Sequence, residues 1–341
     1  MKESINYKKL NKDKVQCLTC SHYCQINKAG FGICGVRKNL EGKLYFLLDN
    51  RPAAMNIDPI EKKPLYHFLP GSKSFSLGTL GCNFRCDNCH NFDISQADVR
   101  DDKILQNSSI NLSKEEIIKR ALQENCKSIS YTYNEPTIFL EYAFDIMKLS
   151  REKGLKNVWV SNGFMSDETL EIVAPYLDAI NIDIKSMDEE FYLKNCSGRL
   201  EPVLNNAKEI VKKGIWLEIT TLIIPGLSDD KKMLESLALF IKKELGDFVP
   251  WHLSAFSPEI SWKLTASDTT SVEKLKQIYN LAEKIGLKYV YAGNIFENNL
   301  GNTICPVCEQ IVIKRNIYDV ARFDKQGKCP GCKNKIQGIF N

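Results

Sequence analysis

The chain has 341 residues, of which 43% are hydrophobic and 26% are charged, and its formal net charge at pH 7 is +4. This length allows one large domain with one or two small ones, and the composition is that of an ordinary soluble globular protein. The charge is too small to indicate a nucleic-acid partner, and no apolar run approaches the roughly 20 residues of a membrane-spanning helix. The first residues carry no apolar signal segment, so we expect a cytoplasmic protein.

Thirteen cysteines are many for such a chain. In a reducing compartment, cysteines bind metals or take part in redox chemistry more often than they form disulfides. Eleven of them fall into three clusters that are separated by long cysteine-free stretches, which predicts three separate metal sites. Cys126 and Cys196 stand alone and are interpreted as packing residues.

Residues 1–73 form an N-terminal extension with a four-cysteine set and an expected strand at 43–48. Three prolines between residues 58 and 71 predict a loop or an extended crossing there. We expect the four cysteines to bind zinc in a closed, non-catalytic site, with a second iron–sulfur cluster as the alternative. This N-terminal cysteine set consists of Cys17, Cys20, Cys24 and Cys34.

Residues 74–300 alternate apolar, β-rich runs with amphipathic stretches, which is typical of a parallel sheet covered by helices. The number of units allows a full or partial TIM-type barrel or an open doubly wound sheet, and periodicity does not choose between them. A capping box at Ser113 opens the first expected helix. Strands are expected at 74–80, 128–133, 157–161, 179–185, 216–223, 249–255 and 288–292. Further helices are expected near 137–153, 167–176, 203–213, 229–244 and 271–285.

Directly after the first of these strands, Cys82, Cys86 and Cys89 follow the spacing C-x3-C-x2-C, with no fourth cysteine nearby. A closed zinc site or electron-transfer cluster needs four protein ligands. Three thiolates on a cuboidal cluster leave one iron open. The spacing resembles the signature of the radical S-adenosylmethionine (SAM) enzymes, in which that iron binds SAM and a 5′-deoxyadenosyl radical is produced. The alternatives are half of a zinc site or a reactive thiol cluster. We call these three residues the loop cysteines.

Chemistry in such folds gathers at the carboxyl ends of the strands. Asn134 and Glu135 follow the second strand, in the place of the Gly-Gly-Glu motif of radical SAM barrels, and Glu135 is expected to accept the amino group of SAM. The alternative for Glu135 is an acid at a helix N-terminus. Ser161 and Asn162 end the third strand and are expected to hold ribose or carboxylate, although Asn-Gly is equally a turn signal.

Asp183 and Lys185 share one face of the fourth strand, and both are expected to bind the cofactor. Lys185 is also expected to meet the SAM carboxylate as a catalytic residue. The alternative is a structural salt bridge. His252, on the sixth strand, is the second catalytic candidate because it is positioned to face a substrate; a buried, hydrogen-bonded histidine is the alternative. Residues 301–341 form a short module with paired cysteine knuckles, typical of a zinc ribbon, with rubredoxin-type iron as the alternative. This C-terminal cysteine set consists of Cys305, Cys308, Cys329 and Cys332.

Almost the whole chain resembles the radical SAM member of the AmmeMemoRadiSam system, a relative of the pyruvate formate-lyase activating enzymes. The resemblance rests on the three cysteine sets and on the motifs at 58–65, 81–86, 133–136, 181–185 and 291–294. It implies a partial (β/α)6 TIM-type barrel, a 4Fe-4S cluster, SAM, and association with Memo-like and AMMECR-type proteins.

Departures from the family pattern concern the cofactor. Phe84 and Asn88 are expected to contact SAM, but the position of Asn88 is usually aromatic, so adenine must be held by hydrogen bonds instead. The pair His90-Asn91 after the third loop cysteine is similar to the pair found in glycyl-radical activases. Val160 stands where those activases have an acidic residue, which argues against a cation site beside the SAM carboxylate.

We therefore expect a radical SAM enzyme that receives electrons from a flavodoxin- or ferredoxin-type donor and acts on a small molecule. The first alternative is a glycyl-radical activase whose substrate is a partner protein. The second is a non-catalytic metal-binding scaffold. If the substrate is a small molecule, the two flanking cysteine modules would cover the mouth of the barrel. An activase instead needs an open groove for a peptide.

Overall fold

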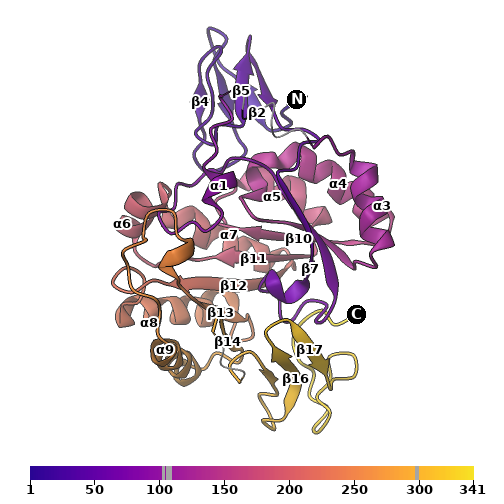
Figure 1. Ribbon diagram of the computed structural model, residues 1–341, viewed down its shortest axis with the longest axis vertical. Helices are drawn as coiled ribbons and strands as arrows, with labels where there is room; N and C mark the ends of the chain where they lie inside the picture. Colours follow the sequence, from indigo (N-terminus) through magenta and orange to yellow (C-terminus); the bar gives the residue numbers. More distant parts are fainter. Residues whose placement is uncertain (102–103, 105–109, 296–298) are drawn as a thin grey trace.

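The computed structural model describes residues 1–101, 104, 110–295 and 299–341. An N-terminal module and a C-terminal module lie at opposite ends of the long axis, and a helix-covered sheet lies between them (Figure 1). None of the described helices is long and apolar enough to cross a membrane.

The central sheet has eight strands, and each strand pairs with its neighbour in the sequence. Because this order never reverses, the chain winds in one direction as in a barrel, which excludes the doubly wound alternative. Seven strands run parallel, one more than the six-unit barrel implied by the resemblance, and the eighth is an antiparallel edge strand. In spatial order the strands are β14 (Val290–Gly293), β13 (Trp251–Ala255), β12 (Trp216–Ile223), β11 (Ala179–Asp183), β10 (Lys156–Ser161), β9 (Ser128–Tyr131), β8 (Lys73–Gly78) and β7 (Ala54–Pro59).

The predicted helices are present, and most begin at a residue that caps them. The Ser113 hydroxyl accepts a hydrogen bond from the backbone N–H of Glu116, as the capping box predicts, and Ser166, Asp230 and Ser271 cap later helices in the same way. The helices are α3 (Lys114–Gln123), α4 (Leu140–Glu152) after the turn η2 (Pro136–Phe139), α5 (Asp167–Val173) with η3 (Ala174–Tyr176), α7 (Leu200–Lys212), α8 (Lys231–Phe240) with η5 (Ile241–Leu245), and α9 (Val272–Ile285).

Among the described elements that follow β8, four short helical ones were not predicted. They are α1 (Phe92–Ser95) after the loop cysteines, α6 (Glu189–Phe191), which continues into the π-helical η4 (Tyr192–Cys196), and η6 (Pro258–Ile260). Each is five residues or fewer, too short to show a helical repeat of apolar residues.

The expectation of a loop or extended crossing for residues 58–71 is wrong at its start, where residues 58 and 59 end strand β7. Pro59 closes this strand opposite Lys73. Proline is tolerated there because β7 lies at the sheet edge, where a missing N–H breaks no hydrogen bond to another strand.

After η1 (Ile60–Lys62), the chain crosses beneath the amino ends of the parallel strands. The Asn181 amide donates to the carbonyl of Pro64 at 2.8 Å, and the Glu218 carboxylate accepts from the backbone N–H groups of Tyr66 and His67 at 2.9 and 2.8 Å. The crossing segment therefore provides partners for the amide nitrogen of Asn181 and for both carboxylate oxygens of Glu218, and it covers that end of the sheet.

The N-terminal module contains two small antiparallel sheets, one of which includes the predicted strand at 43–48. Its own core is small, with Val15, Ile26 and Leu44 fully or nearly fully buried. The sheets are formed by β1 (Lys2–Glu3), β6 (Lys43–Phe46) and β5 (Arg37–Leu40), and by β2 (Tyr7–Lys9), β3 (Val15–Cys17) and β4 (Gln25–Ile26).

The C-terminal module is a three-stranded sheet of β15 (Thr303–Ile304), β16 (Ile311–Asn316) and β17 (Asp319–Arg322). Arg315 anchors it to the crossing segment by donating to the carbonyl of Tyr66 at 2.7 Å, and it lies 3.7 Å from the Glu61 carboxylate. The module therefore packs beneath the amino ends of the strands and does not roof their carboxyl ends.

A buried ion pair attaches the N-terminal module to the central sheet. Arg37 donates to both carboxylate oxygens of Glu141 on α4, at 2.9 and 2.8 Å, and both side chains are at most 2% exposed. We expect Glu141→Gln to lower the free energy of unfolding by about 3 kcal/mol, because the Arg37 charge stays buried without its partner. Urea unfolding measures this loss. Glu190→Gln, which breaks an exposed pair with Lys194, is the control and should leave the unfolding midpoint unchanged; equal effects of the two variants would contradict the assignment.

Candidate functional site

The loop cysteines lie on one loop, residues 79–91, at the carboxyl end of β8. We call this segment the cluster loop. Cys86 is buried, and Cys82 and Cys89 are partly buried. The backbone N–H of Phe84 points to the Cys82 sulfur at 3.5 Å, and the Ser95 hydroxyl lies 3.1 Å from the Cys89 sulfur. Donors beside thiolates stabilise their negative charge, as metal–thiolate centres require.

The donor set fits a multi-iron cluster better than a single ion. Within the described residues, the loop cysteines do not form a group of three ligand atoms that all lie within 4.8 Å of one another. A cubane cluster binds each cysteine through a different iron, so its thiolates stay farther apart. Two buried atoms of the same loop, Asn83 Nδ2 and Asn88 Oδ1, have no hydrogen-bond partner, which leaves them available to a bound group.

Asparagines tie the cluster loop to the next strand. The Asn134 amide donates to the carbonyl of Gly81 at 2.8 Å, and its oxygen accepts from the backbone N–H of Thr79 at 3.3 Å. The Asn91 amide donates to the carbonyl of Tyr133, a residue with a positive φ of 72°. Asn134, predicted as a cofactor contact, therefore holds the loop itself, and its contact with SAM stays a prediction.

Three predicted site residues come together around one buried carboxylate. Glu135 accepts from the Thr137 backbone at 3.1 Å and the Ser161 hydroxyl at 2.9 Å through one oxygen, and from the Asn162 backbone at 2.7 Å through the other. The Asn162 amide donates to Asn83 Oδ1 at 2.8 Å, which joins this group to the cluster loop.

Glu135 also caps η2 through its bond to Thr137, so the alternative role, an acid at a helix N-terminus, is present as well. Burial raises the pKa of Glu135 despite these donors. A desolvated carboxylate of this kind gains from a cationic partner, and one acceptor position of its second oxygen is not used by the described protein groups.

Lys185 lies beside the cluster loop. Its ammonium is 3.1 Å from the Asp183 carboxylate, and its backbone N–H donates to the Tyr192 hydroxyl at 3.0 Å. Burial alone would lower the pKa of Lys185, but Asp183 and the thiols of Cys86 and Cys196 raise it well above its usual range. The side chain therefore provides a permanent positive charge near the loop cysteines.

Cys196 was interpreted only as a packing residue, and it is fully buried in the core. Its thiol also lies beside that of Cys86, which raises the pKa of Cys196, and Cys196 in turn lowers the pKa of Cys86. Sequence gave no sign of this contact, because 110 positions separate the two residues and the π-helical turn η4 that positions Cys196 has no sequence signature.

The remaining predicted residues lie deeper. Phe84 is 1% exposed and packs against the rings of Phe164 and Tyr192, so it supports the cluster loop from inside the core. A β-carbon at Gly198 would lie 2.3 Å from the Phe84 ring, and glycine is therefore required there. A direct contact of Phe84 with a cofactor stays a prediction.

His252 is the second residue of β13 and points into the buried polar group at the amino ends of the strands. Its Nε2 lies 2.6 Å from the Glu218 carboxylate, and its ring packs on those of Tyr66 and Tyr291. Burial would raise the pKa of Glu218, but the imidazole of His252 lowers it. These are the contacts of a structural histidine, and the structure does not bring His252 together with Lys185. Its catalytic role stays a prediction.

Two neighbouring segments form backbone hydrogen bonds with the cluster loop on two sides. On one side, the carbonyls of residues 195–196 accept from the backbone N–H groups of Arg85 and Asp87 at 2.8 and 2.9 Å. On the other, the N–H groups of residues 262–263 donate to the carbonyls of Cys89 and Asp87 at 3.1 and 2.9 Å. The loop is thus held by backbone bonds that do not depend on side-chain identity.

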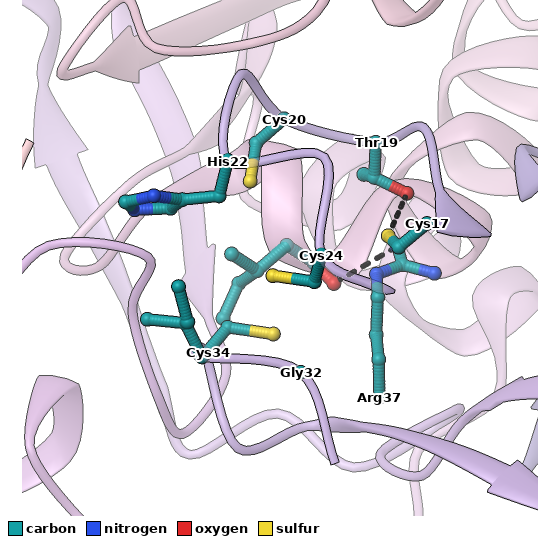
Figure 2. Close-up of a pocket in the computed structure, with 10 residues that line it drawn as sticks. Cys17, Thr19, Cys20, His22, Cys24, Gly32, Cys34 and Arg37 are labelled. Carbon is teal, nitrogen blue, oxygen red and sulfur yellow. Dashed lines mark hydrogen bonds between the residues drawn. The ribbon is translucent and has the colours of Figure 1, made fainter. Parts of the chain in front are cut away.

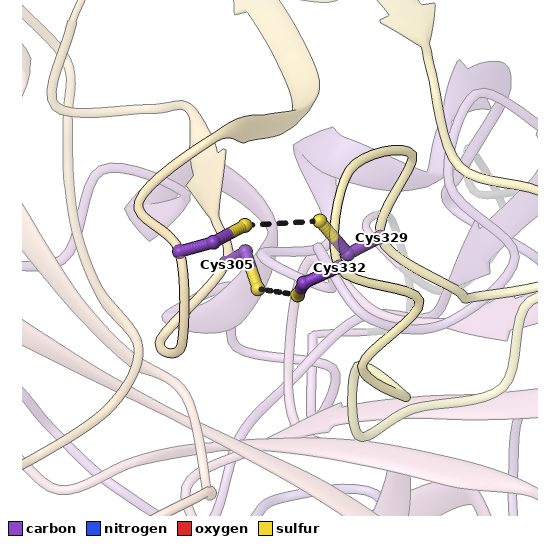
Figure 3. A group of neighbouring side chains, drawn as sticks. Cys305, Cys329 and Cys332 are labelled. Carbon is purple, nitrogen blue, oxygen red and sulfur yellow. Dashed lines mark hydrogen bonds between the residues drawn. The ribbon is translucent and has the colours of Figure 1, made fainter.

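The two flanking cysteine sets differ in spacing. In the N-terminal module, all four predicted cysteines line one cavity together with His22 and Arg37 (Figure 2). In the C-terminal module, the sulfurs of Cys305 and Cys332 lie 3.5 Å apart, as do those of Cys308 and Cys329 (Figure 3). Among the described residues, only the C-terminal set brings its ligand atoms within 4.8 Å of one another.

Comparisons with known proteins agree with this site. The family described as the Radical SAM superfamily matches residues 77–238, which include the cluster loop, Glu135, Asn162 and Lys185. The chain is 41% identical to an uncharacterized protein of Methanocaldococcus jannaschii over the full length of both. It is 25% identical to the pyruvate formate-lyase-activating enzyme of Clostridium pasteurianum over 58% of this chain and 85% of that one.

Among solved structures, Streptococcus suis SuiB bound to precursor peptide SuiA is similar, with a TM-score of 0.50 and 15% sequence identity. The similarity covers 69% of this chain and 51% of that chain, and it concerns the fold alone. The chain belongs to the radical SAM superfamily. It is an enzyme of the class that uses a 4Fe-4S cluster and SAM, and within this class it is related to the pyruvate formate-lyase activating enzymes.

The entry to the cluster loop leaves no room for a side chain at Gly78. A β-carbon there would lie 2.4 Å from the carbonyl oxygen of Thr132 and 3.0 Å from Asn134 Oδ1. We expect Gly78→Ala to destabilise the fold by about 1–3 kcal/mol and to reduce iron loading at the loop cysteines. Thermal unfolding and iron analysis after anaerobic reconstitution measure both effects. Gly293→Ala, whose added methyl group meets no atom within 4 Å, is the matched control. If Gly78→Ala loads iron as the control does, the proposed constraint is absent.

Proposed function

We propose that Cys82, Cys86 and Cys89 bind a 4Fe-4S cluster and that the surrounding strand ends bind SAM. A cluster held by three thiolates supplies one electron and an open iron, and with them it splits SAM into methionine and a 5′-deoxyadenosyl radical. The observation that carries the proposal is the hydrogen-bonded group of Glu135, Ser161 and Asn162, which reaches the cluster loop at Asn83.

Each residue has a defined task in this proposal. Glu135 accepts the SAM ammonium through its free acceptor position, because burial has made its carboxylate favour a cation. Lys185 carries a lasting positive charge for the SAM carboxylate, and Asp183 positions it. Asn88, whose buried carbonyl oxygen lacks a partner, takes the hydrogen bonds of the adenine amine in place of aromatic stacking.

We infer that the radical acts on a small molecule. The backbone bonds from residues 195–196 and 262–263 hold two segments against the cluster loop, and the N-terminal module packs against it as well. These contacts narrow the approach for a polypeptide substrate. On the resemblance of its sequence motifs, we further propose that the chain acts in the AmmeMemoRadiSam system, with Memo-like and AMMECR-type proteins as its partners and a flavodoxin- or ferredoxin-type protein as its electron donor.

The second candidate is a glycyl-radical activase, and the similarity to several activating enzymes favours it. The two functions differ in what SAM cleavage requires. In an activase, SAM cleavage depends on a partner protein whose glycine is the substrate. In the favoured function, a small-molecule extract added to the purified chain raises the amount of 5′-deoxyadenosine that is formed. Stimulation by a protein fraction alone would select the activase.

Loss of one loop cysteine tests the cluster assignment. We expect anaerobically reconstituted protein with dithionite and SAM to release 5′-deoxyadenosine, and we expect Cys86→Ala to reduce this release by at least about 10³-fold, because the cluster loses one of its three protein ligands. Chromatography of the quenched reaction measures the product. Cys126→Ala removes a buried cysteine outside the three sets and should retain the activity. SAM cleavage that survives in Cys86→Ala contradicts the assignment.

We propose that the C-terminal cysteine set binds one zinc ion in a ribbon-like site formed by residues 301–341. Four sulfurs within 4.8 Å of one another suit a single tetrahedral ion. The module buries few side chains of its own, so a metal would supply much of its stability.

Removing one of these ligands should release the metal and unfold the module. We expect Cys308→Ser to lose one zinc ion per chain and to expose the peptide bonds around β16 and β17 to protease, since an incomplete ligand set binds zinc weakly. Elemental analysis and limited proteolysis measure the two effects. Wild-type protein that carries iron and no zinc at this site would contradict the proposal in favour of a rubredoxin-type centre.

A further inference from the structure

The N-terminal cysteine set surrounds a single cavity. Cys17, Cys20 and Cys34 are buried, Cys24 is partly exposed, and all four come from loops and strand ends of the same module. In Figure 2 their sulfur atoms lie around a common space, with the Arg37 side chain at its edge.

The sulfurs of this set are more widely spaced than those of the C-terminal set. A tetrahedral zinc site with Zn–S bonds of about 2.3 Å holds its sulfurs about 3.8 Å apart. The C-terminal set of the same chain has sulfur–sulfur distances of 3.5 Å, whereas within the described residues the N-terminal set contains no group of three ligand atoms within 4.8 Å of one another. A 4Fe-4S cubane binds each of its four cysteines through a different iron atom, so the cysteine sulfurs lie farther apart than those around one zinc ion.

The cavity lies directly beside the cluster loop. His22, which lines the cavity, has its Nε2 2.8 Å from the carbonyl oxygen of Asn83, the residue after Cys82. A β-carbon at Gly81, the residue before Cys82, would lie 2.7 Å from the carbonyl oxygen of Cys34. The backbones that carry a ligand of each site are therefore in direct contact.

We propose that the N-terminal cysteine set binds a second 4Fe-4S cluster, which passes electrons to the cluster on the loop cysteines. This proposal rests on the proposed function for its acceptor. Four cysteine ligands leave no iron open, so the second cluster binds no SAM and serves in electron transfer. One electron from a reduced flavodoxin- or ferredoxin-type donor reduces the second cluster, moves on to the loop cluster, and enters the C5′–S bond of SAM. That bond breaks into methionine and the radical, and no proton is taken up.

The presence of a second cluster is tested in the full-length variant Cys82→Ala/Cys86→Ala/Cys89→Ala, reconstituted anaerobically with iron and sulfide. We expect it to retain roughly four iron and four sulfide per chain and, after dithionite reduction, an electron paramagnetic resonance signal that added SAM leaves unchanged. A variant that holds no sulfide and binds two zinc ions per chain would overturn the proposal.

A reciprocal variant keeps the test decisive if the triple variant fails to fold. Cys20→Ser/Cys24→Ser leaves the loop cysteines intact, so we expect its iron content to fall to about half of the wild-type value while a SAM-sensitive signal persists. Unchanged iron content would overturn the proposal. If no form of the protein shows a SAM-sensitive signal, the proposed function fails, but the iron retained by the triple variant still decides whether the N-terminal cluster exists.

Electron transfer through the second cluster has its own measurement. In Cys20→Ser/Cys24→Ser, we expect reduced flavodoxin to reduce the loop cluster at least tenfold more slowly than in the wild type, as followed by the growth of its resonance signal. Dithionite, a small reductant that reaches the loop cluster directly, should reduce it to the same extent in both proteins. Equal rates with flavodoxin would rule out the relay.

Discussion

The site depends on one constraint, the hydrogen bonding that holds the cluster loop against the carboxyl ends of β9 and β10. A loop that must present three thiolates to one cluster cannot rely on its own residues, because a metal-free loop has little internal packing. Asn134 fixes its beginning and Asn91 its end, while Asn162 joins its middle to the buried carboxylate of Glu135. The group that fixes the loop is thus the same group that we propose for SAM binding, so the proposal couples cluster binding and SAM binding through it.

The two modules at the ends of the sheet have different relations to this constraint. The C-terminal module and the crossing segment cover the amino ends of the strands, where Glu218 satisfies two backbone N–H groups and His252. They stabilise the sheet at the end away from the chemistry. The N-terminal module lies at the cluster loop, to which it is joined by His22 and by Arg85, whose guanidinium donates to the carbonyl of Ile33. Of the two modules as described, the N-terminal one contacts the cluster loop, and the proposed electron relay therefore runs through it.

Much of this architecture could be predicted from the sequence because its signals are local. The alternation of apolar strands and capped helices fixed the parallel sheet, and the ends of β10 and β12 lie within one residue of their predicted positions. The knuckle spacing of the C-terminal set likewise brought four sulfurs together. These features depend on neighbours within a few residues, where propensity and periodicity act.

Other features depend on contacts between distant segments, and sequence reasoning missed them. Strand β7 was not predicted, and its last two residues were expected to belong to a loop or an extended crossing. Its proline is tolerated only at a sheet edge, and the whole sheet determines which strand lies at the edge. Cys196 lies beside Cys86, and residues 262–263 form backbone hydrogen bonds with the cluster loop. Both arrangements arise from turns that have no sequence pattern. The metal of the N-terminal set, zinc or an iron–sulfur cluster, stays a prediction, because the cysteine count alone does not choose between the two.

The most direct test of the central claim asks whether SAM binds the cluster iron that the loop cysteines leave open. Electron–nuclear double resonance on the reduced Cys20→Ser/Cys24→Ser protein, with SAM labelled with ¹⁵N at its amino group, isolates the loop cluster. We expect a coupling between the amino nitrogen and the cluster. A loop cluster that shows no such coupling and keeps the same spectrum with and without SAM would contradict the claim.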